Sequence, residues 1–160
     1  MARLLIYDER LFGDPPWEDA HATCLVNEKH SMTSIVTWIK SKTKKYKGQD
    51  TVYIMAHGND GWIELGRDGL DSSNVHHWAP LEWKLDRIII LACSVAKSNK
   101  GYWFLSQLAW YTSSWVTAAS TNQKYIALPF GLGSATFGKW EGKVHTWGPD
   151  GQWAGSFTEF

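Results

Sequence analysis

Apolar residues recur along this chain with two periods, which predict an alternation of strands and helices. Short apolar runs rich in β-branched residues are typical of strands, and they occupy residues 3–7, 22–26, 52–56, 87–92 and 115–119. The third and fourth runs are continuous, as expected for strands that a parallel sheet buries on both faces.

Helical spacing occurs in two of the segments between these runs. Residues 32–46 follow the candidate N-cap Ser31, and residues 101–111 follow the fourth strand. The apolar positions of one helical face are Met32, Ile35, Val36 and Ile39 in the first segment and Phe104, Leu105, Leu108 and Tyr111 in the second. A weaker helical pattern covers residues 74–85. Strands that alternate with helices predict an α/β fold, a three-layer α/β/α sandwich with a mainly parallel sheet.

Two further segments predict hairpins. Residues 61–66 alternate with period two and predict a small hairpin at the edge of the sheet. In the tail, residues 140–147 and 152–157 flank Gly148-Pro149-Asp150-Gly151, which suits a type I turn. We therefore expect one domain over residues 1–160, with a core over about 3–125 and a Trp- and Gly-rich β-hairpin extension over about 129–160.

Composition and charge narrow the classes of partner. The 160 residues carry 16 basic and 16 acidic side chains, a formal net charge of zero. Nucleic acid and anionic membrane are poor partners for such a chain, because phosphate binding requires a basic excess. The only N-terminal apolar run, residues 4–7, is too short for a signal peptide or a membrane span, so we expect a cytoplasmic protein.

The cysteines and histidines do not indicate a metal site. Cys24 and Cys93 are the two cysteines, and we expect both to be free thiols in a reducing compartment, with Cys24 a strand filler. His76 and His77 are adjacent, diverge on a helix or a strand, and have no Cys/His quartet around them. We therefore expect no metal and no cofactor.

A histidine and a cysteine each follow one of the continuous apolar runs. His57-Gly58 follows the run at 52–56, and Cys93 follows the run at 87–92. The carboxyl ends of neighbouring parallel strands meet at one crevice, so these side chains are expected to meet. A thiol nucleophile with a histidine acid/base is the minimum for thiol-based acyl transfer. The backbone N–H of Gly58, and that of Cys93 if a helix begins near it, are candidate oxyanion donors.

This order of motifs resembles the caspase–haemoglobinase fold of cysteine peptidases. The nearest likeness is to the bacterial caspase-like domains found in larger surface or signalling proteins. The shared stretches are His57-Gly58, the Gly-x-Ile-x-Leu-Gly segment at 61–66, the Cys-x-x-Ala step at 93–96, the helix at 101–109 and the strand at 116–120, which together span about residues 3–125. Ala92-Cys93-Ser94 lacks the caspase Gln-Ala-Cys signature, and the His57–Cys93 spacing is shorter than the roughly 50 residues of caspases. Caspase specificity is therefore not implied.

The resemblance implies a role for each site residue. Cys93 would be the nucleophile of a Cys-His dyad, His57 the acid/base, and the N–H groups of Gly58 and Cys93 the oxyanion hole. The residues implied for substrate binding are Asp8, Glu9, Arg10, Ser120 and Thr121. Asp8 or Glu9 would favour a basic P1 side chain and Arg10 an acidic one, and the sequence leaves this choice open.

Three functions from different classes follow. The first is a cysteine endopeptidase (a thiol protease) that cleaves a protein or peptide partner, or itself, through a thioester acyl-enzyme, controlled by homodimerisation or a regulatory protein. The second is a catalytically inactive caspase-like interaction module. The third and weakest is a glycan or small-ligand binder that uses Trp140, Trp147 and Trp153 of the hairpin. Asp60 is either a turn former or a residue that orients His57.

Overall fold

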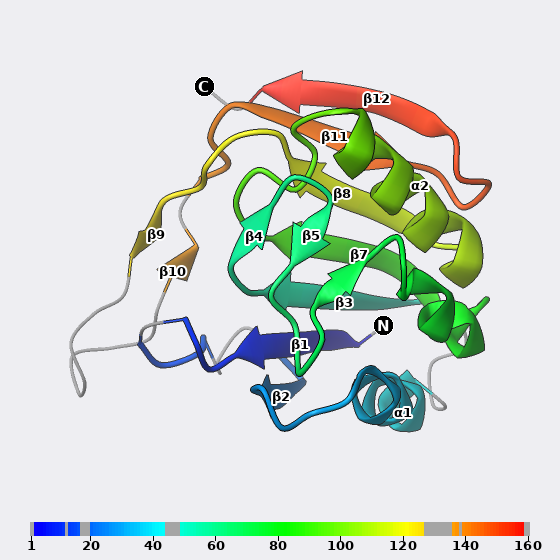
Figure 1. Ribbon diagram of the computed structural model, residues 1–160. Coiled ribbons are helices and arrows are strands. Elements are labelled where there is room, and N and C mark those ends of the chain that lie inside the picture. Colours follow the sequence, from blue (N-terminus) through cyan, green and yellow to red (C-terminus); the bar gives the residue numbers. More distant parts are fainter. Residues whose placement is uncertain are drawn as a thin grey trace.

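The computed structural model describes residues 2–11, 13–16, 20–43, 49–126, 136–137 and 139–158. Its centre is a seven-stranded sheet with the strand order β12-β11-β8-β7-β3-β1-β2 (Figure 1). The strands are β1 (Arg3–Asp8), β2 (Ala22–Val26), β3 (Asp50–Met55), β7 (Leu85–Leu91), β8 (Trp115–Ala119), β11 (Lys143–Trp147) and β12 (Trp153–Thr158). Neighbouring strands pair in parallel throughout the set β8, β7, β3, β1 and β2. The strands β11 and β12 extend the sheet beyond β8 by antiparallel pairing. A mixed α/β fold with a mainly parallel sheet is therefore confirmed.

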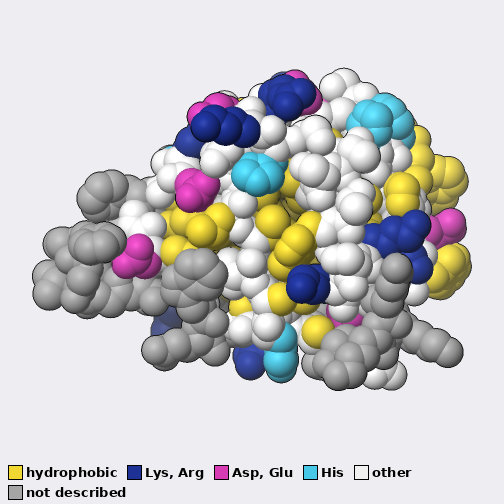
Figure 2. Space-filling view, turned by 90° about the horizontal axis from the view of Figure 1, so that it is seen from below, with side chains coloured by type: hydrophobic (Ala, Val, Ile, Leu, Met, Phe, Trp, Pro, Cys, Tyr) yellow, Lys and Arg dark blue, Asp and Glu magenta, His cyan; other side chains and the backbone are white. Residues whose placement is uncertain are grey.

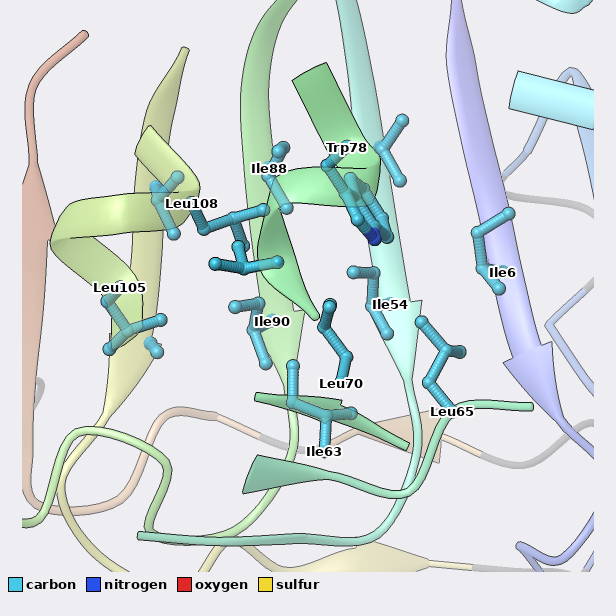
Figure 3. Packing of buried hydrophobic residues seen from close by; sticks show 14 of the residues in the cluster. Ile6, Ile54, Ile63, Leu65, Leu70, Trp78, Ile88, Ile90, Leu105 and Leu108 are labelled. Carbon is cyan, nitrogen blue, oxygen red and sulfur yellow. The ribbon is translucent and has the colours of Figure 1, made fainter. Parts of the chain in front are cut away.

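The helices pack on one face of this sheet. They are α1 (Met32–Thr43), the 3₁₀ helix η2 (Val75–Leu81) and α2 (Asn99–Thr112). Alternate strand residues such as Ile6, Ile54 and Ile88 lie in one buried cluster with Trp78 of η2 and Leu108 of α2 (Figure 3). Burial of one large apolar side chain stabilises a fold by about 1.5–3 kcal/mol. This layer is therefore the main source of the stability that holds the strand ends in place.

The opposite face of the sheet carries a smaller apolar cluster. Leu5, Tyr7 and Met55 lie there, and Leu11 from the loop after β1 packs against them. Within the part of the chain that the structure describes, α1 and α2 both pack on the first face. The second helical layer of a three-layer sandwich is not among these residues and stays a prediction.

A second sheet of three short strands lies over the helix-covered face. Its strands are β4 (Gly58–Asn59), β5 (Trp62–Ile63) and β6 (Leu70–Asp71). Ile63, Leu65 and Leu70 are fully buried and lie against the central strands (Figure 3). The predicted edge hairpin at residues 61–66 is therefore wrong in its placement, because β5 pairs with β4 and β6 and not with the main sheet. Two further short strands, β9 (Tyr125–Ile126) and β10 (Thr136–Phe137), pair with each other.

The helices begin and end near the predicted residues. α1 ends at Thr43, and the predicted continuation over 44–46 lies outside the described residues. The weak pattern at 74–85 forms η2 and no α-helix. Ser98 caps the start of α2 by accepting the Lys100 N–H, and Ser113, whose φ of 51° is left-handed, caps the end of the helix after Thr112. Among the described residues, no helix has the length and apolar character needed to cross a membrane.

The tail forms the predicted hairpin and belongs to the main sheet. The Gly151 N–H donates to the Gly148 carbonyl at 2.9 Å and closes the turn between β11 and β12. Val144 of β11 pairs with Ala119 of β8, so the hairpin continues the sheet beyond β8. The part of the predicted extension at 129–135 lies outside the described residues.

Candidate active site

Five parallel strands end at the same edge of the sheet, and the loops after β1, β3, β7 and β8 form the candidate active site. Met55 at the end of β3 pairs with Leu91 at the end of β7, and His57 and Cys93 each follow two residues later. The strand order reverses between β1 and β3, and open α/β sheets bind ligands at such a reversal. The predicted meeting of the His57 and Cys93 loops thus has its basis in the strand register.

Gly58 brings these two loops into direct contact. A Cβ atom at Gly58 would lie 2.8 Å from the Cys93 carbonyl oxygen and 2.8 Å from the Ala92 Cβ. The Gly61 N–H also donates to the Val95 carbonyl at 3.0 Å. The backbone at Gly58 can come this close to the turn that carries Cys93 only because glycine has no Cβ atom.

Asp60 ties the same hairpin to the start of α2. Its carboxylate accepts hydrogen bonds from the N–H groups of Ser98 at 3.0 Å and Gly101 at 3.1 Å, and from the Ser98 hydroxyl. Burial acts to raise the pKa of Asp60, but these hydrogen bonds and the charge of Lys100 lower it overall. Asp60 therefore fastens the hairpin to a helix N-terminus, where a carboxylate is favoured, and does not orient His57.

Cys93 is half-buried in a turn that the segment after β8 holds. The Gln123 N–H donates to its Sγ at 3.3 Å, and its thiol donates to the Gln123 carbonyl at 3.6 Å. In the next residue, the Ser94 N–H donates to the Thr121 carbonyl at 2.9 Å and its hydroxyl to Asn122 Oδ1 at 2.7 Å. Sequence reasoning missed Asn122 and Gln123, for which the signal was that their segment follows β8, the strand beside the cysteine strand.

His57 is exposed and has its own partner. Its Nε2 lies 3.3 Å from the Arg10 carbonyl oxygen, which only accepts hydrogen bonds. Nε2 therefore carries the proton, and in the neutral ring Nδ1 is the nitrogen able to take up another. The structure thus brings the loops of His57 and Cys93 together while each side chain bonds to a different backbone segment.

The Gly58 N–H is oriented away from its own hairpin. The Glu64 N–H donates to the His57 carbonyl at 2.9 Å, which makes Gly58 and Ile63 a non-hydrogen-bonded pair of the β4–β5 ladder. Cys93, by contrast, is not followed directly by a helix, because α2 begins at Asn99. Of the two predicted oxyanion donors, the Gly58 N–H therefore lies outside the β4–β5 ladder, and the Cys93 N–H is not at a helix start.

A comparison with protein-family models assigns the chain to a family. The family model of a domain of unknown function, DUF4347, matches residues 11–125, which is more than half of the chain. The chain belongs to the DUF4347 family. The matched range contains both loops of the candidate site and ends before the β11–β12 hairpin. No curated protein and no solved structure matches this chain.

Asp8 and Arg10 of the DUF4347 domain pair with each other. Arg10 Nε and a terminal nitrogen donate to the Asp8 carboxylate at 2.7 and 2.6 Å, and Asp8 is 1% exposed. Arg10 also reaches Glu64 at 3.3 Å and the Gly66 carbonyl at 2.8 Å. The hydrogen bond to Asp8 raises the pKa of Arg10 against the opposing effect of burial. The Arg10 charge is therefore engaged by Asp8 and Glu64, and the Arg10 backbone is what meets His57.

The other predicted substrate-binding residues also have partners inside the domain. Glu9 accepts a hydrogen bond from the Asn27 amide at 2.8 Å, next to the end of β2. The Ser120 hydroxyl donates to the Lys143 carbonyl at 2.8 Å, and the Thr121 hydroxyl to the Glu141 carbonyl at 2.6 Å. Ser120 and Thr121 thus hold the segment before β11 against the loop that contacts Cys93.

The described residues of the domain contain neither a metal-ligand cluster nor an open surface shared by Trp147 and Trp153. Within the described ranges, no three His, Cys, Asp or Glu residues lie together as a metal site. In the hairpin, Trp147 is 2% exposed while Trp153 is 56% exposed. The Trp153 indole N–H donates to His145 Nδ1 at 3.2 Å. Trp147 and Trp153 of the hairpin therefore do not share one open surface.

Proposed function

We propose that this DUF4347 domain is a cysteine peptidase of the caspase–haemoglobinase type that cleaves a protein partner or itself. The observation that carries the proposal is the contact between Gly58 and the Cys93 turn, at the ends of two paired parallel strands. A structural cysteine does not require such a contact with a histidine loop. The proposal includes the three-layer form of the fold, in which a further layer covers the face of Leu5, Tyr7 and Met55.

The reaction needs only groups of this chain and water. Cys93 Sγ attacks the scissile carbonyl carbon, and its proton passes to His57 Nδ1. The oxyanion receives the Gly58 N–H, and the tetrahedral intermediate collapses to a thioester as His57 protonates the leaving amine. Water, deprotonated by His57, then hydrolyses the thioester and restores the thiol.

The His57 side chain has room to reach this position. The imidazole is exposed, and the bond to the Arg10 carbonyl at 3.3 Å is long. Catalytic hydrogen bonds are often poorly aligned without substrate and tighten when substrate binds. We therefore place the formation of the His57–Cys93 pair in the substrate complex.

A second function is favoured by one specific observation. Both polar contacts of the Cys93 thiol go to the backbone of Gln123. A thiol that stays there serves packing, and the domain is then a non-catalytic interaction module. Both cysteines are free thiols in either case, which supports the expectation of a reducing, cytoplasmic compartment.

Labelling by electrophilic peptide probes distinguishes the two functions. A panel with acidic, basic and apolar P1 groups is applied to the wild type, Cys93→Ala and the matched control Cys24→Ala, and adducts are located by mass spectrometry. Cys24 is a suitable control because burial raises its pKa and so disfavours its thiolate. The peptidase proposal predicts one adduct, on Cys93, that Cys24→Ala retains and Cys93→Ala loses. No adduct on Cys93 with any probe would support the interaction module.

A further inference from the structure

Three exposed tryptophans lie around a groove at the opposite edge of the sheet from His57 and Cys93. Trp83, Trp103 and Trp110 are 72%, 61% and 60% exposed. The groove has a volume of about 680 Å³, and a smaller depression of about 270 Å³ continues it by sharing Trp110, Tyr111 and Asp150. It lies between η2, the end of α2 and the β11–β12 turn, on the right in Figure 1. Figure 2 shows hydrophobic side chains gathered at the same end of the molecule.

The backbone of Trp83 is strained in a way that packing does not explain. Its φ of 62° is left-handed, a conformation that costs a bulky residue energy and that glycine or asparagine adopts more easily. Its N–H donates to the Thr112 carbonyl at 3.2 Å, which fixes the residue at the end of α2. Because the indole is mostly in solvent, neither burial nor backbone preference accounts for a tryptophan at this position.

The rest of the groove is built on a firmly held surface. The rings of Trp110 and Tyr111 lie edge to face with centroids 5.0 Å apart. The Ser106 hydroxyl donates to the Gly151 carbonyl at 2.6 Å and so pins the β11–β12 turn to α2. Trp103 and Trp110 are two helical turns apart on one side of α2, about 10 Å along the axis.

The charged side chains that line the groove favour binding of a cation. Among the described residues that line it, the charged side chains are Glu82 and Asp150, and both are acidic. Neither carboxylate forms an ion pair with a described residue. The last carbonyls of α2 point to the same end, at Ser113, and add partial negative charge. Indole faces attract cations as well, and Arg more often than Lys.

We propose that this groove binds an extended basic segment of a protein partner. One arginine side chain lies between Trp83 and Trp110 and pairs with Glu82 or Asp150, and a second arginine stacks on Trp103. In a segment with the extended polyproline II conformation, side chains three residues apart lie on the same side of the chain and about 9 Å apart, close to the roughly 10 Å between Trp103 and Trp110 along the helix axis. The site is independent of Cys93 and of any peptidase activity.

Binding of a defined peptide tests this proposal on the full chain carrying Cys93→Ala, which prevents cleavage. The probe is acetyl-Gly-Arg-Gly-Gly-Arg-Gly-amide, and its control replaces both arginines by citrulline, which keeps the shape and removes the charge. Titration is followed by tryptophan fluorescence and by NMR of the indole N–H groups. The arginine peptide is expected to bind saturably and about tenfold more tightly than the citrulline peptide, with shifts confined to the groove tryptophans.

Variants locate the binding site. Trp83→Ala, Trp110→Ala and the double variant Glu82→Gln/Asp150→Asn are each expected to weaken arginine-peptide binding severalfold. Trp153→Ala removes an equally exposed tryptophan outside the groove and is expected to leave binding unchanged. Since these side chains are at the surface, circular dichroism is expected to show native folding for all of them.

Three results would overturn the proposal. They are equal binding of the citrulline peptide, equal loss of binding in Trp153→Ala, and binding of the neutral sugar chitohexaose at the groove tryptophans without binding of the arginine peptide. The last would assign a glycan site to this groove. None of the three bears on whether Cys93 is a nucleophile.

Discussion

The two edges of the sheet use their polar groups in opposite ways. At the carboxyl edge, the carboxylates of Asp8 and Glu64 pair with Arg10, and the reactive loops touch through backbone atoms. At the amino edge, the carboxylates of Glu82 and Asp150 have no cationic partner among the described residues, and large aromatic side chains face solvent.

This difference separates a site that depends on geometry from a surface that depends on contact area. At the carboxyl edge, adding a single side-chain atom at Gly58 would displace the loops that carry His57 and Cys93. At the amino edge, loss of a side chain removes contact with a partner but leaves the fold intact. Substitutions at the two edges should therefore affect stability very differently.

Arg10→Ala is expected to have the largest effect. It removes the ion-pair partner of the Asp8 carboxylate, which is 1% exposed but still accepts hydrogen bonds from the N–H groups of Arg10 and Gly66. Because these bonds remain and Arg10 is partly exposed, the free energy of unfolding should fall by about 2–4 kcal/mol, somewhat less than for a fully buried pair. The matched control is Arg87→Ala, whose ion pair with Asp86 is exposed and should contribute less than about 1 kcal/mol. Urea unfolding measures both, and equal losses would show that the carboxyl edge does not depend on internal pairing.

Gly58→Ala is expected to act on both stability and chemistry. Its Cβ would lie 2.8 Å from the Cys93 carbonyl and 2.9 Å from Val95 Cγ2, so overpacking should lower the free energy of unfolding by about 1–3 kcal/mol. Probe labelling of Cys93 should also be lost. Gly148→Ala is the control, because its nearest atom would be 3.2 Å away, in the Asp150 side chain. Native labelling in Gly58→Ala would contradict the role given to this contact.

Asp60→Ala is expected to lower the free energy of unfolding by about 1 kcal/mol, because it removes the acceptor for two N–H groups at the start of α2. The pKa of Asp60 is lowered in the folded state, so its contribution is present above the pKa of the unfolded chain, 3.8, and is lost as the pH falls below it. The variant should therefore lose less stability than wild type between pH 5 and pH 2, on the order of 1 kcal/mol less. Asp68→Ala, at an exposed position, should not alter that pH dependence.

His145 of β11, which lies between the two edges, is expected to make the smallest contribution to the free energy of unfolding. Burial, and then the charge of Lys143, lower its pKa from the usual 6.5. The folded state therefore favours the neutral ring, and its stability is complete above pH 6.5 and falls as the pH drops through the lowered pKa. Thermal unfolding at pH 7.5 and pH 5 should show this loss in wild type and a smaller one in His145→Gln, while His76→Gln, at an exposed position, should behave as wild type.

Local patterns predicted the strands and helices well. Continuous β-branched runs such as 88–90 and helical faces such as that of α2 need no knowledge of distant contacts. The hairpin at 61–66 was misplaced because a period of two says which residues are buried but not which strand they pair with. The sequence also does not say on which face of the sheet a helix packs.

The two candidate sites differ in how far sequence could find them. His57 and Cys93 were predictable because each directly follows an apolar strand, and neighbouring parallel strands end together. Gln123 was missed because its backbone, not its side chain type, contacts the thiol. The groove was missed because Trp83 is distant in sequence from Trp103 and Trp110 of α2, and the packing of η2 on α2 brings them together.

The rate at which an electrophilic peptide probe labels Cys93, in wild type and in His57→Ala, tests the central claim most directly. If His57 takes the thiol proton, the rate constant should fall by about 10²-fold or more in His57→Ala at neutral pH, while labelling of Cys24 stays unchanged. Rate constants for Cys93 that agree within about twofold between the two proteins would contradict a Cys93–His57 dyad.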